Sequence, residues 1–321
     1  MQAQLKEPES KNQTVATRVC PICGHRKVRE VLRAPDRFHS KKELYTLVRC
    51  SECTVVWLQN PPGPLEMNQH YTADYHRAIS ANNEHPDHWT KRRQMIHRYK
   101  SGGTLLDLGC SAGGFLAAMR GPWWKLFGVE ICEDVAQRAR ENTGAEVFIG
   151  DILDAPFPAQ SFDAITCFNV FEHLYDPHAV LAKVAKWLKP GGIFYCFVPN
   201  IDSAGYRLFR SHWYALELPR HLYHFSPASL RFIATAVGLQ ELSIATHREL
   251  FFERSTRYVV DSMLEKAGVS RVSMAEAPPA NLPWKVVRKA LRVSVLPAIT
   301  ALAALFGDGE IITVILTKPS T

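Results

Sequence analysis

Long apolar runs are missing from this chain of 321 residues. No stretch reaches the roughly 20 consecutive apolar residues that a membrane-spanning helix needs, so we expect no transmembrane segment. Residues 1–17 are polar and lack the apolar centre of a signal peptide. We therefore expect a flexible tail there and no secretory leader.

Cysteine is uncommon outside two C-x-x-C pairs, and its distribution argues against a disulfide framework. The chain holds eight cysteines, and half of them are scattered through apolar stretches, where free buried thiols are common. This pattern favours a reduced, cytoplasmic protein. The four scattered cysteines are Cys110, Cys132, Cys167 and Cys196.

Charge of one sign is not in large excess. The net charge is +7, and residues 1–60 hold 11 Lys and Arg against 6 Asp and Glu. A basic face can meet nucleic acid, a phosphorylated substrate or an anionic membrane, but a balance this modest is most often a solvated surface. With 46% apolar residues, the length suffices for one α/β catalytic domain and a small accessory unit.

The two C-x-x-C pairs predict a structural zinc site. Cys20 and Cys23 form the first pair, Cys50 and Cys53 the second, in the spacing C-x2-C-x26-C-x2-C. Four thiolates complete a closed tetrahedral Zn²⁺ site, which supplies folding energy that a module of this size otherwise lacks. The sequence N-P-P-G-P at 60–64 is a boundary signal, so we expect the zinc-binding module to span residues 18–64.

Strand and helix patterns alternate after residue 104. Continuously apolar strands separated by helices predict an α/β fold with a mostly parallel sheet covered on both faces. Ligands bind such sheets at the carboxyl ends of the strands. We also expect a helix over 65–100, with Tyr71 and Tyr75 on one face. The expected strands are 104–108, 125–130, 147–149, 162–170, 193–198, 239–245 and 311–316, and the expected helices between them are 113–120, 133–142, 179–188 and 226–237.

A glycine-rich turn follows the first of these strands. Residues 109–114 read G-C-S-A-G-G between a strand and a helix, where glycines let the backbone approach a ligand closely. Glu130 ends the next strand, 21 residues after Gly109, a separation that suits a ribose hydroxyl. Ser111 stands where a dinucleotide-binding turn has its middle glycine, which weighs against NAD.

Three further motifs occur in order after this turn. G-D-I at 150–152 follows the third strand, N-V-F-E-H-L at 169–174 follows the fourth, and L-K-P-G-G at 188–192 precedes the fifth. Over residues 100–245 the chain resembles the class I S-adenosylmethionine (SAM) methyltransferases, and is closest to the group that includes quinone-biosynthesis O-methyltransferases. A zinc ribbon before a similar catalytic domain also occurs in deoxysugar C-methyltransferases, which the chain resembles in that order of modules.

The resemblance implies a Rossmann-like, seven-stranded, mostly parallel sheet and SAM as the cofactor. It implies that Gly109 and Gly113 pack against the cofactor, that Glu130 holds the ribose, and that Asp151 holds the adenine. Asn169 is expected to line the methionine end, and Asp107 matches the acidic residue of the family's first strand. The expected cofactor-binding residues are Asp107, Gly109, Gly113, Glu130, Asp151, Ile152 and Asn169.

Aromatic and imidazole groups cluster after the fifth strand. Trp213-Tyr214 and the sequence P-R-H-L-Y-H-F at 219–225 suit a substrate lid with a general base. His173, His221 and His224 are the candidate bases, and the sequence does not choose among them. Each of the three is as readily explained as a structural histidine.

A basic and then apolar segment lies between the last two strands. Four basic residues at 285–292 precede the apolar residues 293–306. This stretch is too short to span a bilayer, and it predicts either a core or lid helix or an interfacial helix that makes a peripheral membrane contact. We expect it within a helical insertion at about 251–307 of a methyltransferase domain spanning 65–321. The basic residues are Lys285, Arg288, Lys289 and Arg292.

Four functions remain open at this point. The leading hypothesis is methyl transfer to a small-molecule acceptor at oxygen, and a second is C-methylation of a nucleotide-linked sugar. An RNA methyltransferase is disfavoured, because the basic module has few aromatics for base stacking and residues 167–170 read C-F-N-V instead of the N-P-P-aromatic signature of amino-group methylases. A catalytically inactive binding module is disfavoured by the intact cofactor motifs. The acceptor and the oligomeric state are not determined by the sequence.

Overall fold

The computed structural model describes residues 19–72, 75, 86–247, 251–266 and 309–320. The expected tail at 1–17 and the basic-then-apolar segment at 285–306 lie outside the described residues. Within the described part of the chain, no helix is both long and apolar enough to cross a membrane.

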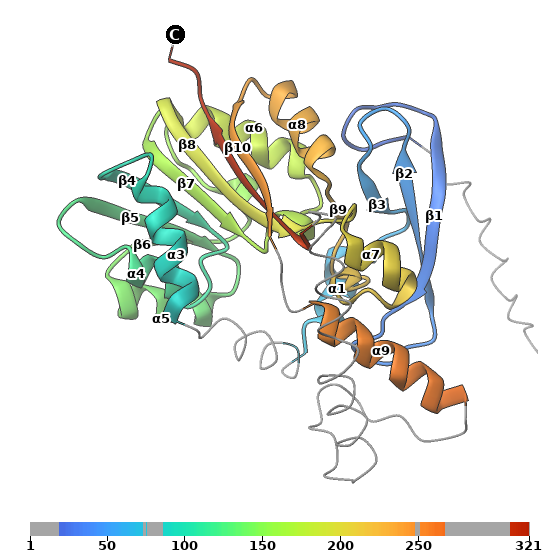
Figure 1. Ribbon diagram of the computed structural model, residues 1–321. Helices are drawn as coiled ribbons and strands as arrows, with labels where there is room; N and C mark the ends of the chain where they lie inside the picture. Colours follow the sequence, from blue (N-terminus) through green and yellow to red (C-terminus); the bar gives the residue numbers. More distant parts are fainter. Residues whose placement is uncertain (1–18, 73–74, 76–85, 248–250, 267–308, 321) are drawn as a thin grey trace, which may run out of the picture.

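A seven-stranded sheet forms the centre of the catalytic part (Figure 1), in the strand order β10-β11-β8-β7-β4-β5-β6. The neighbours from β8 to β6 all pair in parallel, whereas β11 is antiparallel to both β8 and β10. The predicted seven-stranded, mostly parallel sheet is confirmed. Its strands are β4 (Gly103–Leu108), β5 (Trp124–Glu130), β6 (Glu146–Ile149), β7 (Phe162–Phe168), β8 (Leu188–Pro199), β10 (Gln240–His247) and β11 (Ile311–Thr317).

Helices cover both faces of this sheet because its strands are apolar on both sides. Leu105 and Leu106 are both fully buried, and they belong to two different core clusters. The cluster of Leu105 includes residues of α3, α4 and α5, whereas that of Leu106 includes residues of α6 and α8. These helices are α3 (Pro86–His97), α4 (Gly114–Ala118), α5 (Glu133–Thr143), α6 (Pro177–Trp187) and α8 (Pro227–Ala236).

Local signals fix the ends of several helices. The Asp176 carboxylate accepts a hydrogen bond from the backbone N–H of Ala179 and caps α6, while Ser226 caps α8 in the same way. Proline follows each cap at the first helical position. Gly144, at φ +71°, ends α5 in the left-handed conformation that glycine adopts without strain.

A second, antiparallel sheet carries the two C-x-x-C pairs. Its order is β1-β2-β3-β9, where β1 is Val28–Pro35, β2 is Leu44–Cys50, β3 is Val56–Leu58 and β9 is Tyr223–His224. β9 comes from the segment that the sequence predicts as a lid. Trp57 lies opposite Tyr223, and the backbone N–H of Leu58 donates to the Leu222 carbonyl at 2.8 Å. The catalytic part therefore contributes a strand to the N-terminal sheet.

The prediction of one helix over 65–100 is wrong. α1 (Pro64–Met67) and the 3-10 turn Asn68–His70 are followed by Tyr71, whose φ of −101° and ψ of 65° are not helical. Tyr75 is helical again, and the next helix along the described chain is α3. Tertiary contacts account for the break, because the Tyr71 hydroxyl lies 3.1 Å from His173 Nδ1. Tyr71 and Tyr75 still contact each other edge to face, with ring centroids 5.3 Å apart.

Two more helices border the N-terminal sheet. α7 (Ala204–Phe209) follows β8, and α9 (Phe251–Lys266) lies at the start of the expected helical insertion. In Figure 1 both lie on the side of the molecule that carries β1 and β2, and α9 packs on the turns that follow α7. The remainder of the expected insertion, up to residue 307, lies outside the described residues.

Candidate functional site

The four cysteines of the C-x-x-C pairs converge at one end of the N-terminal sheet. Cys20 Sγ lies 3.5 Å from Cys53 Sγ, and Cys23 Sγ lies 3.6 Å from Cys50 Sγ. All four sulfur atoms are within 4.8 Å of one another and none forms a disulfide. Four thiolates about 2.3 Å from one Zn²⁺ ion have mutual distances in this range, so the cluster fits a tetrahedral zinc site.

Backbone groups around this cluster support the thiolate form. The N–H of Glu52 donates to Cys50 Sγ at 3.3 Å. The N–H of Gly24 donates to the Cys20 carbonyl, and Gly24 takes φ +72°, which closes the first pair into a tight knuckle. Hydrogen bonds to sulfur favour the charged form of a ligand, as a metal site requires.

The glycine turn lies at the carboxyl end of β4, as expected. A Cβ atom at Gly109 would lie 2.5 Å from Val170 Cγ2, and one at Gly113 would lie 2.8 Å from Thr143 Cγ2. Both positions therefore exclude a side chain for packing reasons. Ser111 takes φ +48° in the middle of the turn, a conformation that favours glycine.

Glu130 joins this turn to the end of β5. Its two carboxylate oxygens accept hydrogen bonds, each of 3.0 Å, from the backbone N–H groups of Ser111 and Cys132. One side chain thus fixes the loops after two neighbouring parallel strands. The loops after β4 and β5 form a single edge, the place where open α/β sheets bind ligands.

The remaining expected cofactor residues lie on or beside the same edge. Asn169 directly follows β7 with φ +54°, and the Asp151 carboxylate accepts from the N–H of Leu153 at 2.7 Å in the turn after β6. Ile152 is buried. Asp107 is buried within β4, where it accepts a 2.6 Å hydrogen bond from the Thr166 hydroxyl, and burial raises its pKa to about 7.

The three candidate histidines lie together beside this edge. The His173 ring lies 4.6 Å from that of His221, and the His221 ring lies 6.1 Å from that of His224. The structure therefore brings together residues from the turn after β7, from the loop before β9 and from β9 itself. The hydrogen bonds of each ring distinguish the roles of the three histidines.

His221 is held as a charged group. Its Nδ1 donates to the Ala215 carbonyl at 2.9 Å, and its Nε2 lies 2.9 Å from Glu217 Oε2. Burial alone lowers the pKa of a histidine, but the Glu217 carboxylate raises that of His221 above its usual value. In turn, His221 and Arg220 outweigh burial and hold the pKa of Glu217 at about 2. A protonated imidazole cannot accept another proton, so His221 is not a base in this arrangement.

His173 and His224 are neutral, and only His173 is partly exposed. Burial, helped by the charge on His221, lowers the pKa of each ring to about 3. His173 Nδ1 donates to the Arg220 carbonyl at 3.0 Å, which leaves the lone pair on Nε2. His224 is 2% exposed and donates from Nε2 to the Leu216 carbonyl. Of the three, His173 best fits a general base.

The low pKa of His224 has a consequence for acid stability. A histidine whose pKa falls from 6.5 unfolded to about 3 folded contributes stability above pH 6.5 and loses it progressively as the pH falls toward 3. We expect the free energy of unfolding to fall less in His224→Gln than in the wild type when the pH is lowered from 7 through this window. Chemical unfolding at pH 7, 5.5 and 4.5 measures this, and equal pH dependence in both proteins would contradict it.

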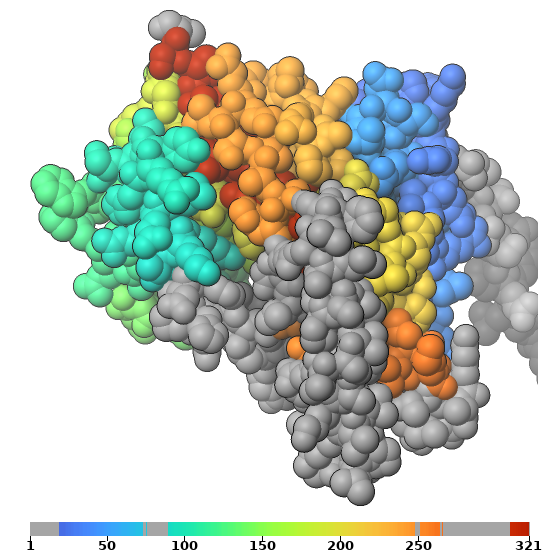
Figure 2. All heavy atoms as spheres, viewed as in Figure 1, coloured from blue at the N-terminus to red at the C-terminus, as the bar shows by residue number. Residues whose placement is uncertain are grey.

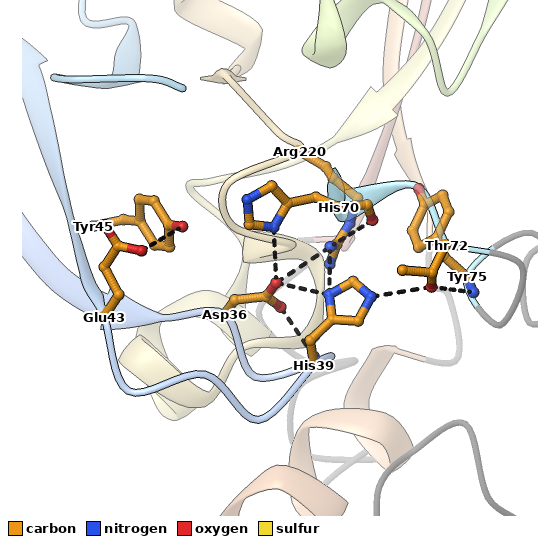
Figure 3. Close-up of polar contacts among 8 residues, drawn as sticks. All are labelled: Asp36, His39, Glu43, Tyr45, His70, Thr72, Tyr75 and Arg220. Atoms are coloured by element: carbon orange, nitrogen blue, oxygen red, sulfur yellow. Dashed lines mark hydrogen bonds and ion pairs between the residues drawn. The ribbon is translucent and has the colours of Figure 1, made fainter. Parts of the chain in front are cut away.

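A buried cluster around Asp36 lies on the other side of Arg220 (Figure 3). Asp36 Oδ2 lies 2.8 Å from His39 Nδ1, 3.3 Å from His70 Nδ1 and 3.5 Å from Arg220 Nη1. Asp36 and Arg220 are both fully buried. Arg220 and His39 lower the pKa of Asp36 despite its burial. The Arg220 guanidinium also faces the rings of Phe38 and Tyr75.

Two groups besides the cysteines bring possible ligand atoms within 4.8 Å of one another in the described chain, but each has a feature that opposes a metal cation. In the group Asp36, His39 and His70, the Arg220 guanidinium lies 3.3 Å from His39 Nδ1. In the group Glu172, His173 and His221, the His221 Nε2 already bonds to Glu217. The cysteine cluster is the better fit for a metal.

A family model for a methyltransferase domain matches residues 81–244, slightly more than half of the chain. The chain belongs to this family. The matched region contains β4–β8, the glycine turn and the histidine cluster, so the edge described above is that of a SAM-dependent methyltransferase domain.

Relatives of the methyltransferase domain differ in the acceptors that their names state. The ubiquinone biosynthesis O-methyltransferase of Thiobacillus denitrificans is 28% identical over 165 residues, which cover 47% of this chain and 71% of the relative. The probable tRNA methyltransferase 9B of Mus musculus is 31% identical over 122 residues, which cover 37% of this chain and 27% of the relative. Several of the relatives are thus matched over less than two thirds of their own length.

A solved SAM-dependent methyltransferase from Thermotoga maritima, described as a possible histamine N-methyltransferase, shares the fold of this methyltransferase. It is 17% identical with a TM-score of 0.50, over 78% of this chain and 97% of that protein. At this identity the likeness concerns the fold alone.

Sequence reasoning missed the charged partners of the methyltransferase's histidines. The carboxylates of Glu217 and Glu172 lie 2.9 Å and 4.0 Å from His221 Nε2, and Glu172 is 1% exposed with its pKa raised by burial to about 7. Arg220 stands in the quoted lid segment, but nothing in the segment indicates that its partner is Asp36, 184 residues earlier.

Proposed function

We propose that the chain transfers a methyl group from SAM to a small-molecule acceptor, at oxygen. The observation that carries the cofactor assignment is the bonding of Glu130 to the loops after β4 and β5 at the ligand-binding edge of a methyltransferase domain. The small-molecule assignment is supported by the longer match to the O-methyltransferase relative and by the enclosed histidine cluster.

The proposed cofactor site uses the residues expected from the sequence. Gly109 and Gly113 give the turn its close approach, Glu130 binds the ribose hydroxyls, and Asn169 lines the methionine end. Asp151 and Ile152 hold the adenine, the former by a hydrogen bond and the latter by apolar contact. Asp107 acts indirectly, because its carboxyl is bonded to Thr166 inside the sheet.

The proposed catalytic work of the chain is orientation and proton removal. SAM supplies an electrophilic methyl group bonded to a sulfonium sulfur, and this sulfur is a good leaving group. The loop from 213 to 225 encloses the acceptor and excludes water, so that the acceptor oxygen is held in line. His173 accepts the acceptor's proton at Nε2, while its Nδ1 stays bonded to the Arg220 carbonyl. The ion pair of His221 and Glu217 holds this loop in place.

We expect Glu130→Ala to raise the Kd for SAM. The loss of a paired ribose contact costs about 1–3 kcal/mol, or roughly 5- to 150-fold in Kd. Titration calorimetry with SAM measures this, and Glu133→Ala is the matched control because Glu133 is an exposed carboxylate three residues along. Equal affinity in the wild type and Glu130→Ala would exclude the proposed site.

C-methylation of a nucleotide-linked sugar is the second candidate. The order of modules favours it, since the four-cysteine cluster precedes the catalytic sheet and the N-terminal sheet that carries the cluster takes β9 from the catalytic part of the chain. Identification of the methylated atom in the product by NMR distinguishes oxygen from carbon as the acceptor.

We infer that the cysteine cluster holds one structural Zn²⁺ ion and that residues 18–64 form its module, followed by the methyltransferase domain at 65–321. Elemental analysis of the purified chain should give one zinc per chain, and Cys53→Ser should lose most of it. The pairing of β3 with β9 then predicts faster hydrogen exchange at the Leu58 N–H in this variant. Cys132→Ser, which changes an exposed cysteine outside the cluster, should keep the metal. A metal-free wild type with a protected Leu58 N–H would contradict the inference.

A further inference from the structure

A groove of about 500 Å³ separates the N-terminal sheet from the segment that follows β8. Strands β1 and β2 form one wall, and Ile201 and α7 form the other. Figure 2 shows the blue surface of the N-terminal sheet next to the yellow surface of α7. The groove therefore lies where two modules meet, a common place for ligand sites.

Arginine dominates the charge of this groove. Four of its lining residues are arginines, Arg29 and Arg49 on the N-terminal sheet and Arg207 and Arg210 at α7. The lining carboxylates are Glu30 and Asp202. With four positive and two negative side chains, the lining has a net charge of +2.

Both carboxylates are already engaged. Asp202 Oδ1 accepts a 2.8 Å bond from Arg49, which ties the two walls together, and Glu30 pairs with the exposed Arg33 at 2.9 Å. Arg29 and Arg210 have no carboxylate partner among the described residues. Two guanidinium groups thus border a concave surface with their charge uncompensated.

A buried hydroxyl lies beside these arginines. Tyr206 lines the groove and is 3% exposed, and its hydroxyl has no hydrogen-bond partner in the described structure. Arg210 lies over its ring, 5.2 Å from the centroid. A buried hydroxyl without a partner costs free energy, which a bound acceptor oxygen removes.

We propose that this groove binds the phosphate group of a phosphorylated small molecule. The planar guanidinium donates paired hydrogen bonds to phosphate oxygens, and a net charge of +2 matches a phosphate dianion. The volume lies in the range of about 300–1,000 Å³ typical of small-molecule sites, so it also admits the organic part of the ligand. This binding does not depend on the proposed methyl transfer.

The groove's position connects it with the catalytic sheet. Ile201 and Asp202 follow the carboxyl end of β8, and the preceding Asn200 forms a bridge to Phe225 beside β9. A phosphate held there lies at the same sheet edge as the glycine turn.

Calorimetry on the full chain with inorganic pyrophosphate and with uridine diphosphate tests the proposal. We expect a Kd below about 1 mM for at least one probe at low ionic strength, weakening with added salt. Arg210→Gln and Arg29→Gln should each weaken binding about tenfold or more. Arg231→Gln is the matched control, because Arg231 is an arginine paired with Glu241 away from the groove; it should bind as the wild type does.

The outcomes that overturn the proposal are distinct. Absence of pyrophosphate and uridine diphosphate binding by the wild type overturns it, as does unchanged binding in both groove variants when their thermal unfolding matches the wild type. If the groove variants instead lose binding of a single-stranded RNA oligonucleotide that the wild type prefers over both probes, the groove is a nucleic-acid site. SAM affinity should be the same in all of these variants.

Discussion

His173→Ala is expected to lower kcat by about 10²-fold while leaving SAM affinity unchanged. General base catalysis contributes about 10²–10⁴-fold. The low end applies because burial and the charge on His221 hold the pKa of His173 at about 3, which weakens it as a base. The same low pKa keeps the ring neutral at every pH above about 3, so its ionisation should not appear as an inflection near pH 6.5 in the kcat profile.

His224→Ala serves as the comparison for this variant. His224 lies in the same cluster and is also neutral, but its ring is buried and its Nε2 donates to the Leu216 carbonyl. We expect His224→Ala to lose at most a few-fold in kcat when it is assayed at a lower temperature, at which its stability matches that of the wild type. Single-turnover kinetics on the true acceptor separate chemistry from binding. Full activity in His173→Ala would show that the base lies elsewhere or that none is needed.

Asp36→Ala is expected to lower the free energy of unfolding by about 3–5 kcal/mol, because it leaves the buried Arg220 without its carboxylate partner in this cluster. His39 and His70 also lose their common acceptor. The loss of a buried ion's partner costs far more than the pair itself contributes. Urea unfolding at pH 7 measures this change as a shift in the midpoint concentration, provided that the m-value is the same in both proteins.

The matched control is Glu30→Ala, which breaks an exposed pair with Arg33 and should cost less than about 1 kcal/mol. The double variant Asp36→Leu with Arg220→Met removes both charges together. If the cost of Asp36→Ala comes from the unpaired guanidinium, the double variant should recover much of the stability. A loss below about 1 kcal/mol in Asp36→Ala would show that Arg220 finds another partner or is not buried.

The catalytic sheet was predictable because its signals are local. Apart from β10, which contains polar residues such as Gln240 and Glu241, its strands are largely apolar runs bounded by a helix or a turn, and the glycine turn and Glu130 mark the ends of two of them. The first and last residues of the strands were predicted less accurately. β8 begins at Leu188 instead of 193 because L-K-P-G-G continues the strand, where Gly191 donates to the Lys318 carbonyl at 2.8 Å.

The pairing between the modules was not predictable in the same way. β9 has two residues, and its pairing with β3 joins positions more than 160 residues apart. Asp36 lies in a basic, polar stretch, and charged residues in such stretches are usually exposed. Its burial depends on Arg220, His39 and His70, which the fold brings together from three separate segments.

The candidate histidines illustrate the same limit. The sequence identifies three imidazoles near the ligand edge but not their protonation states. Those states depend on which carbonyl or carboxylate each ring nitrogen faces, and these partners are the backbone of residues 215, 216 and 220 and the side chain of Glu217. Only the folded loop supplies them.

Transfer of tritium from methyl-labelled SAM, measured separately in the small-molecule and RNA fractions of a cell extract, tests the central claim most directly. We expect the wild type to label the small-molecule fraction, Glu130→Ala to label it much less at limiting SAM, and neither to label RNA above background. Label confined to RNA, or equal labelling by the wild type and Glu130→Ala, would contradict the proposal that this methyltransferase acts on a small molecule through the edge formed by β4 and β5.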